Sequence, residues 1–308
     1  MDKEKNFCLK NNIEFYEDFD SSLVSSIRLG ATIKLAVFPK NKRELILILK
    51  FLFASKIAYR VCGNSSNILF VEKINYVVVF TSKMVDEIDY KNKMVTVSAG
   101  MLLPRMCESL KKNKLSGYEG LINIPATVGG AIMSNAGAFG YSISDRLVEI
   151  EVFSNGRVFS IKKNEIHFGY HYSNLFGLIV ISATFLFENK NEYDIIKLCN
   201  EFTYKRGHSQ PNGLSLGSVF KKVNNRSAGF YLERAGLKNF RIGGLVVSNK
   251  HANFFVNDKS GSVMDFLRLL VESQLQVEKQ FGVTLVPEIE KVGDNHETFS
   301  RFSYPFKK

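Results

Sequence analysis

The segment Gly120–Gly140, GLINIPATVGGAIMSNAGAFG, contains five glycines and no charged residue in a chain that is otherwise rich in lysine. Glycine loses more conformational entropy on folding than other residues, so a cluster of glycines needs a reason, such as a positive φ or a close approach of the backbone to another group. The fold must therefore bring something against the main chain of this segment.

Composition indicates a globular protein of more than one domain. The chain has 308 residues, of which 45% are hydrophobic and 23% charged, enough for a substantial core and beyond the size at which one core keeps growing. The formal net charge is +11, from 41 Lys and Arg against 30 Asp and Glu. The lysines are scattered, so we expect a generally basic surface or an anionic small ligand, and no nucleic-acid-binding tract.

The four cysteines, at positions 8, 62, 107 and 199, have neither a CxxC spacing nor that of zinc ligands. We expect free thiols in a reducing cytoplasm, and no metal. The N-terminal residues MDKEKNFCLKNN contain no apolar run, so we expect no export signal. The most apolar stretch, LILILKFLFASKIAYRV, is interrupted by Lys50 and Lys56, so we expect no membrane span.

Local patterns predict a first part rich in strands. Asn41 and Glu44 resemble a capping box and predict a helix through about Lys56, and Asn155-Gly156 between two alternating runs predicts a hairpin. Further strands are predicted for IAYRV, ILFV, YVVVF, MVTVSAG and LIVISATFLFE. Further helices are predicted from Met101 to about Lys114 and over EYDIIKLCNEFTYKRG, which should end at Gly207.

A stretch rich in Pro, Gly and Ser, SQPNGLSLGS, follows Gly207 and precedes a new set of elements. The patterns predict a short helix in SAGFYLERAG, strands in GGLVVS and ANFFVN, a long amphipathic helix in SVMDFLRLLVESQLQVEKQFG and a last strand in VTLVPEIEKVG. This arrangement is typical of a small α+β domain, and we place its boundary between residues 190 and 210.

Two loops could bind a ligand through their backbones. GxGxxG after a strand, GxxxxGK[ST] and HExxH are all absent from the sequence. In GNSSN (63–67), successive N–H groups can form an anion site, although a plain polar turn explains the residues equally well. In IPATVGGA, Pro125 suits a first helical position, which would leave N–H groups for a phosphate. Gly129 and Gly130 would then let a flat ring lie against the main chain, or they would allow a tight helix–strand crossing.

Six ordered motifs carry a family resemblance: GNSSNILF, the segment 120–140, FGYHYSNLF, QPNGLSLGSVFK, AGFYLERAGLKNFRIGGLVVSNKHANFFVN and LVPEIEKVG. Over roughly residues 20–293 the chain resembles the UDP-N-acetylenolpyruvoylglucosamine reductases, in a shorter subtype. The resemblance implies an α+β chain with a two-lobed, non-Rossmann FAD-binding domain, similar to p-cresol methylhydroxylase and vanillyl-alcohol oxidase, and a C-terminal α+β substrate domain. The implied ranges are 1–80 and 81–195 for the two lobes and 196–308 for the substrate domain.

The same resemblance implies an activity. The family reduces the enolpyruvyl ether of UDP-N-acetylglucosamine to UDP-N-acetylmuramate, with FAD as cofactor and NADPH as hydride donor, in peptidoglycan precursor synthesis. We accordingly expect a cytoplasmic monomer with these small-molecule partners and no nucleic-acid or membrane partner.

The resemblance also implies roles for residues. Ser218 would donate a proton to the substrate carbon and Glu288 would assist, although by pattern alone they read as a loop hydroxyl and a solvated carboxylate. The family positions that help to hold the UDP phosphates differ in this chain, so we expect the nearby cations Arg206, Lys221 and Lys222 to bind the substrate instead. The residues implied for FAD are Gly63, Asn64, Ser65, Ser66, Asn67, Ile124, Pro125, Ala126, Thr127, Gly129, Gly130, Asn135 and Ala136.

The chain departs from the family pattern at several positions. His171 stands in place of a catalytic arginine, a permanent charge with a planar donor fork, so a flavin or UDP-sugar-binding protein with weakened catalysis is the alternative function. Ser209 replaces a lysine, and Lys222 replaces an asparagine. Ser65 and Ala126 replace glycines, and we expect both to have negative φ.

Overall fold

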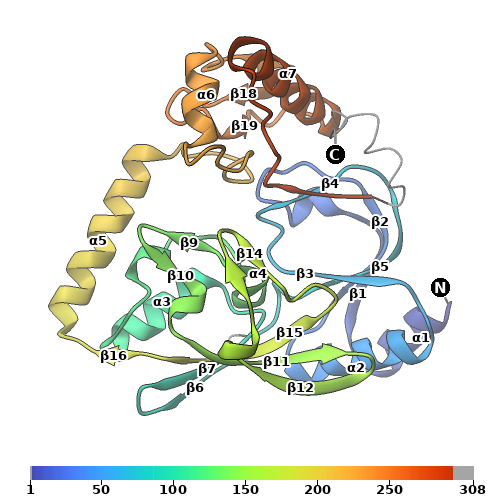
Figure 1. The fold of residues 1–308 in the computed structure, drawn as a ribbon. Helices are drawn as coiled ribbons and strands as arrows, with labels where there is room; N and C mark the ends of the chain where they lie inside the picture. The colour runs from blue at the N-terminus through green and yellow to red at the C-terminus, as the bar shows by residue number, and fades with distance from the viewer. Residues whose placement is uncertain (1, 86, 294–308) are drawn as a thin grey trace. The chain divides into compact units, whose positions relative to one another are not determined.

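The computed structural model describes residues 2–85 and 87–293, and Figure 1 labels its elements. The α-helices of this part of the chain are α1 (Asp2–Lys10), α2 (Lys42–Ala54), α3 (Leu103–Lys112), α4 (Val128–Met133), α5 (Glu192–Ser209), α6 (Ala228–Arg234) and α7 (Val263–Phe281). The longer strands are β1 (Glu14–Asp20), β2 (Thr32–Phe38), β3 (Tyr59–Cys62), β4 (Ile68–Phe70), β5 (Ile74–Phe80), β6 (Ile88–Lys91), β7 (Met94–Ser98), β11 (Leu147–Ser154), β12 (Arg157–Lys162), β15 (Ile179–Leu186), β18 (Leu245–Val247), β19 (Phe255–Asn257) and β20 (Glu290–Val292). The short strands, of two residues each, are β8 (Leu115–Ser116), β9 (Gly137–Ala138), β10 (Tyr141–Ser142), β13 (Phe168–Gly169), β14 (Tyr172–Ser173), β16 (Glu188–Asn189) and β17 (Arg241–Ile242).

The chain divides into two compact units. Unit 1 consists of Met1–Glu17, Leu35–Asn64 and Tyr76–Arg206, and unit 2 consists of Asp18–Lys34, Ser65–Asn75 and Gly207–Lys308. The division falls inside the GNSSN loop, between Asn64 and Ser65. The three-domain boundaries expected from the sequence remain a proposal.

An antiparallel sheet of order β12-β11-β15-β7-β6 forms the centre of unit 1 (Figure 1). Its β11–β12 hairpin turns at Asn155 and Gly156, with φ of 48° and 76°, which confirms the predicted hairpin. The buried residues of α3, α4, β7 and β15 form one hydrophobic cluster. This cluster fixes the glycine-rich segment against the sheet.

A second sheet, of order β1-β2-β5-β3, lies mostly in unit 1. Its strands β3 and β5 are parallel, with Tyr59 opposite Val77. The predicted N-cap of α2 is confirmed, because the Asn41 side chain accepts a hydrogen bond from Glu44 N. Buried leucines of α2 pack with residues of both sheets, including Val77 and Ile181.

Unit 2 has its own hydrophobic core, which joins α6, α7 and the sheet β17-β18-β19. The helix α7 begins after Ser262, whose hydroxyl accepts from Asp265 N, and ends at Gly282 with φ 62°. Its buried face, which includes Phe266 and Leu270, packs in that core. The short strand β20 pairs in parallel with β4, more than 200 residues away in sequence.

Two predicted boundaries were wrong. The helix α5 continues past Gly207 to Ser209. Gly207 lacks the positive φ of a glycine cap, and the helix stops instead before Gln210, whose α conformation is disfavoured by Pro211. The predicted last strand shrinks to Glu290–Val292, which pairs with β4, while Pro287 before it forms only an isolated bridge with Phe220.

Candidate functional site

The GNSSN loop connects β3 to β4, as predicted, and its first half lies against the glycine-rich segment. A side chain at Gly63 would place its Cβ 2.3 Å from Thr127 Oγ1, so no larger residue fits there. The Asn64 side-chain amide donates to the carbonyl of Pro125 over 2.8 Å. Unit 1 therefore brings the beginnings of both predicted loops into direct contact.

The second half of the loop is bonded within unit 2. Asn67 Nδ2 donates to the Glu288 carbonyl over 3.2 Å, and the Asn67 carbonyl accepts from Glu290 N over 2.9 Å. Ser66 connects this half to Ser65 and is partly buried. The loop is thus anchored by hydrogen bonds at both of its ends.

The expectation that Ser65 has a negative φ was wrong. Its φ is 48°, in the left-handed region that costs a residue with a Cβ roughly 1–2 kcal/mol. Its hydroxyl is buried and has no hydrogen-bond partner among the described residues. Ala126 does keep a negative φ, since the positive-φ residues of the described chain do not include it.

Asn135, in the glycine-rich segment, also combines a positive φ with a buried polar atom that has no hydrogen-bond partner among the described residues. Asn135 has φ 45°, and its Oδ1 is buried without a hydrogen-bond partner in the part of the chain that the structure describes. Buried polar groups are nearly always bonded, and an exception calls for an explanation such as a ligand or an ordered water. Within unit 1, Asn135 and the charge-free backbone of the glycine-rich segment around it fit a large polar cofactor such as FAD.

The predicted helix start at Pro125 was wrong. Thr127 is the N-cap of α4, and its hydroxyl accepts from Gly130 N over 3.2 Å, so the helix begins at Val128 and Pro125 lies before it. The next N–H groups are also used, by Val128 to the Met101 carbonyl and by Gly129 to the Ala99 carbonyl. The helix start therefore offers fewer free donors to a phosphate than expected.

The two glycines of α4 have different surroundings. Gly129 is buried, and a Cβ there would lie 2.9 Å from that of Ala99, so it makes the tight helix–strand crossing considered above. Gly130 is exposed, with only Thr127 Oγ1 near its Cβ position, at 3.2 Å. Backbone open to a flat ligand is therefore found at Gly130. Ala136 belongs to the hydrophobic cluster that includes α3, α4, β7 and β15, and Ile124 packs against it.

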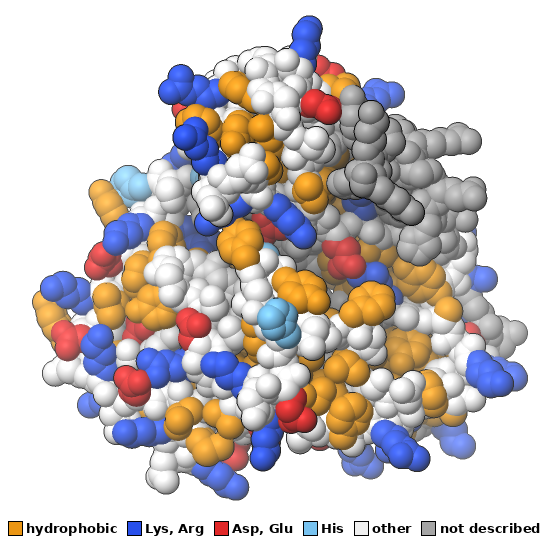
Figure 2. Space-filling view, in the orientation of Figure 1, with side chains coloured by type: hydrophobic (Ala, Val, Ile, Leu, Met, Phe, Trp, Pro, Cys, Tyr) orange, Lys and Arg blue, Asp and Glu red, His pale blue; other side chains and the backbone are white. Residues whose placement is uncertain are grey.

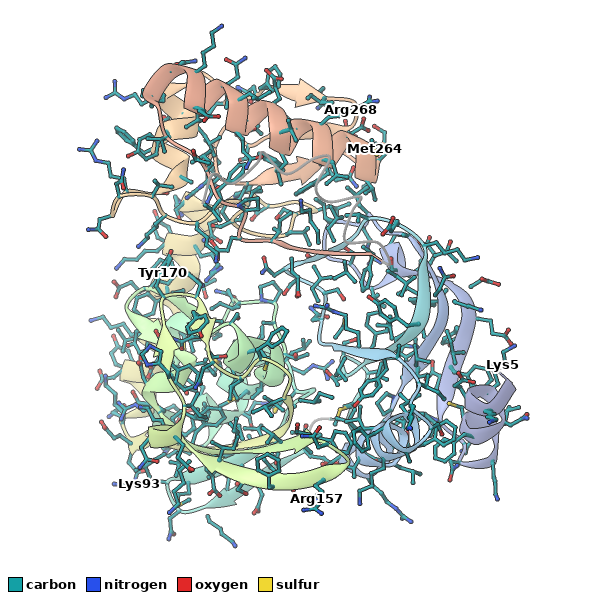
Figure 3. The ribbon with its side chains drawn as sticks, turned by 45° about the vertical axis from the view of Figure 1, so that its right-hand side comes forward. Lys5, Lys93, Arg157, Tyr170, Met264 and Arg268 are labelled. Atoms are coloured by element: carbon teal, nitrogen blue, oxygen red, sulfur yellow. The ribbon has the colours of Figure 1, made fainter. Side chains whose placement is uncertain are left out.

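His171 lies in the turn of the β13–β14 hairpin, with φ 48°. Figure 3 labels its neighbour Tyr170 in this turn; the two rings are 4.3 Å apart, edge to face. The hairpin is bonded to the glycine-rich segment twice: Ser173 Oγ donates to the Met133 carbonyl over 2.7 Å, and Asn135 Nδ2 donates to the Gly169 carbonyl over 2.8 Å. The structure therefore brings the His171 turn beside the predicted cofactor segment.

Ser218 and Glu288 lie on neighbouring segments of unit 2. Glu288 N donates to the Val219 carbonyl over 2.8 Å, and Lys221 N donates to the Val286 carbonyl over 2.8 Å. Phe220 and Pro287 form a bridge between these bonds. The structure thus brings Ser218, Lys221 and Glu288 together, which the sequence spacing alone cannot show.

Burial raises the pKa of the Glu288 carboxyl to about 7, against a smaller lowering effect of the Lys221 and Lys222 ammonium groups. Both lysines are exposed. A carboxyl with a pKa near neutrality can give or accept a proton under physiological conditions. Glu288 is therefore chemically suited to assist a protonation step.

Arg206 is the last residue of unit 1, whereas Lys221 and Lys222 belong to unit 2. Its guanidinium lies 5.7 Å from the centre of the Phe139 ring, and burial lowers its pKa. Phe139 stacks on Phe202 of α5, with ring centres 5.2 Å apart. Arg206 thus lies next to the β9–β10 hairpin, whose turn contains Phe139 and ends the glycine-rich segment.

The distribution of charge, the cysteines and the helices can be compared with the expectations from composition. Figure 2 shows Lys and Arg side chains spread over the visible face. Within residues 2–85 and 87–293, all four cysteines are free and buried, no three metal-ligating side chains are grouped, and no helix has the length and hydropathy required to cross a membrane.

Comparison with known proteins identifies the chain in two parts. Residues 33–161, which contain both loops, match the FAD binding domain, and residues 210–292 match the C-terminal domain of UDP-N-acetylenolpyruvoylglucosamine reductase. The fold and the site therefore define an FAD-dependent oxidoreductase, and the expected α+β fold class is confirmed.

Relatives match nearly the whole chain. The UDP-N-acetylenolpyruvoylglucosamine reductase of Caldicellulosiruptor saccharolyticus is 35% identical over 292 residues, 92% of this chain and 94% of that protein. The Clostridium botulinum enzyme is 33% identical, over 96% of this chain and 100% of its own. The crystal structure of the Thermus caldophilus enzyme has a TM-score of 0.77 at 29% identity, over 91% of this chain and 99% of that one. The chain belongs to the UDP-N-acetylenolpyruvoylglucosamine reductase family.

Proposed function

We propose that the protein is an FAD-dependent reductase that converts UDP-N-acetylglucosamine enolpyruvyl ether to UDP-N-acetylmuramate with NADPH, in peptidoglycan precursor synthesis. The observation that carries this function is the match of nearly the whole chain to enzymes named for it. We further propose that it acts as a monomer in the cytoplasm, where NADPH and the nucleotide-sugar substrate are both found.

The residues proposed to hold FAD are those of the two contacting loops. The GNSSN loop would bind the pyrophosphate, and the exposed backbone at Gly130 would lie along the ring system. Ser65 and Asn135 support this assignment, because each has a buried polar atom without a partner in the described chain. The bound FAD would supply a hydride relay from NADPH to the enolpyruvyl group.

The protein's own residues must handle charge and protons in this reaction. Hydride addition to the terminal carbon of the enolpyruvyl group leaves negative charge on the adjacent carbon and its carboxylate. We propose that Ser218 donates the proton to that adjacent carbon. A serine hydroxyl is a weak acid and needs a neighbour that replaces its proton, and Glu288, whose pKa is raised to about 7, supports that part.

The substrate's negative charges need cations. We propose that His171 stabilises the developing enolate in the place of the family's arginine. Lys221 and Lys222 are proposed to bind the diphosphate, because they are exposed and close to Glu288 on the same unit. Arg206 is proposed as a further cation for the substrate.

The test is spectroscopic. The purified protein should be yellow, lose its flavin absorbance on anaerobic addition of NADPH, and recover it when the enolpyruvyl substrate is added. A colourless protein that takes up no added FAD would refute the proposal. A flavoprotein that NADPH reduces but the substrate does not reoxidise would instead identify the binding protein with weakened catalysis.

A further inference from the structure

Asn253 is a buried amide next to the Ser218 segment that sequence patterns did not single out. It lies just before β19 and is 4% exposed. Its side chain both accepts a hydrogen bond from one residue and donates one to it: Oδ1 accepts from Phe220 N over 3.0 Å, and Nδ2 donates to the Phe220 carbonyl over 2.8 Å. Its own carbonyl accepts from Val219 N over 2.9 Å. Asn253 therefore holds the two residues that follow Ser218.

The other side of the same segment faces Glu288. The Val219 carbonyl accepts from Glu288 N, and Lys221 N donates to the Val286 carbonyl. The side chains of Val219 and Phe220 are each 1% exposed, so this segment cannot shift without disturbing the core. The position of Ser218 relative to Glu288 thus depends on a segment that Asn253 fixes from its opposite side.

A primary amide satisfies this geometry, whereas an ionised carboxylate does not. Phe220 presents both an N–H donor and a carbonyl acceptor, and a primary amide pairs with both. Water cannot replace the amide in a buried site without a cavity to hold it. The turn before Asn253 is also fixed, since Asn253 N donates to His251 Nδ1 over 3.2 Å.

We propose that Asn253 is a positioning residue for the protonation step, which sets the distance between the Ser218 hydroxyl and the Glu288 carboxyl without touching the substrate. This inference rests on the proposed function of these two residues. A misplacement of about 1 Å in a catalytic group can cost on the order of 10²-fold in rate. The step from NADPH to FAD does not use Ser218 or Glu288 and should not depend on Asn253.

The test compares two half-reactions in Asn253→Asp by rapid mixing. The introduced carboxylate can accept from Phe220 N but cannot donate to the Phe220 carbonyl. We expect reoxidation of the reduced flavin by the enolpyruvyl substrate to slow by about 10- to 100-fold at pH 8, with flavin reduction by NADPH unchanged. At about pH 5 the introduced carboxyl group can be protonated and then regains a donor, so the rate relative to wild type should recover.

Asn257 provides the matched control. It is also 4% exposed, and its amide bonds three backbone groups, one more than the amide of Asn253: Nδ2 donates to the Ile27 carbonyl, and Oδ1 accepts from Lys259 N and Gly261 N. Asn257→Asp should lower the melting temperature to a similar extent and leave both half-reactions near wild type. Asn253→Gln, which keeps the amide and moves it by one methylene group, should show the same selective loss as Asn253→Asp.

Three results would overturn the inference. They are equal slowing of both half-reactions in the Asn253 variants, equal slowing of reoxidation in Asn257→Asp, or wild-type reoxidation in both Asn253 variants. Failure of the proposed function is distinguishable, because it would appear in the wild type itself as a lack of FAD or of reoxidation.

Discussion

Glu288→Gln should stabilise the folded protein at alkaline pH and have little effect at acid pH. Burial raises the pKa of Glu288 from 4.5 to about 7. Between these two pH values the folded state therefore keeps a carboxyl proton that the unfolded state has mostly lost. Its contribution to stability is full below pH 4.5 and is lost as the pH rises through about 7. At about 1.4 kcal/mol per pH unit, the ionised carboxylate costs the wild type about 3 kcal/mol, or about 2 kcal/mol after allowance for its partial contact with solvent.

The assay is urea unfolding of wild type and Glu288→Gln at pH 5 and pH 8, without substrate. The free energy of unfolding of the variant relative to wild type should rise by about 2 kcal/mol between the two pH values. Glu290→Gln, at an exposed neighbour on β20, controls for the loss of one negative charge. A difference that is the same at both pH values would refute the assignment of the raised pKa to Glu288.

Further substitutions test the remaining residues. Gly130→Asp should abolish FAD binding with little loss of stability, because a carboxylate is favourable in the first turn of α4; unchanged flavin content per folded chain would make this segment a packing element. Ser218→Ala should slow reoxidation by the substrate by about 10²-fold or more and leave reduction by NADPH intact; equal slowing of both would assign Ser218 a structural role. His171→Arg should raise the rate of reoxidation by the substrate, because arginine is a permanent charge with a planar donor fork, whereas an unchanged rate would mean that another cation serves. Ser65→Gly should raise the unfolding free energy of the FAD-free protein by about 1 kcal/mol, through loss of the left-handed strain; a lower value in urea unfolding would show that its hydroxyl is bonded.

Local interactions made several elements predictable. The Asn41 cap, the Asn155-Gly156 turn and the end of α7 at Gly282 depend on residues within four positions of one another, so their chemistry is readable in the sequence. The six ordered motifs likewise predicted the family, because residue types and their order along the chain can be read directly from the sequence. Within those loops, the sequence did not show which glycine is needed for packing and which for an exposed surface.

Tertiary structure decided the properties that depend on distant partners. Gly129 packs closely against Ala99, Ser65 takes a positive φ in a loop held at both ends, and the pairing of β20 with β4 joins segments more than 200 residues apart. Glu288 looks like an ordinary surface carboxylate in the sequence, and its pKa rises only because folding removes it from water. Burial and hydrogen bonding between remote segments are properties of the packed chain, and no local pattern of residue types contains them.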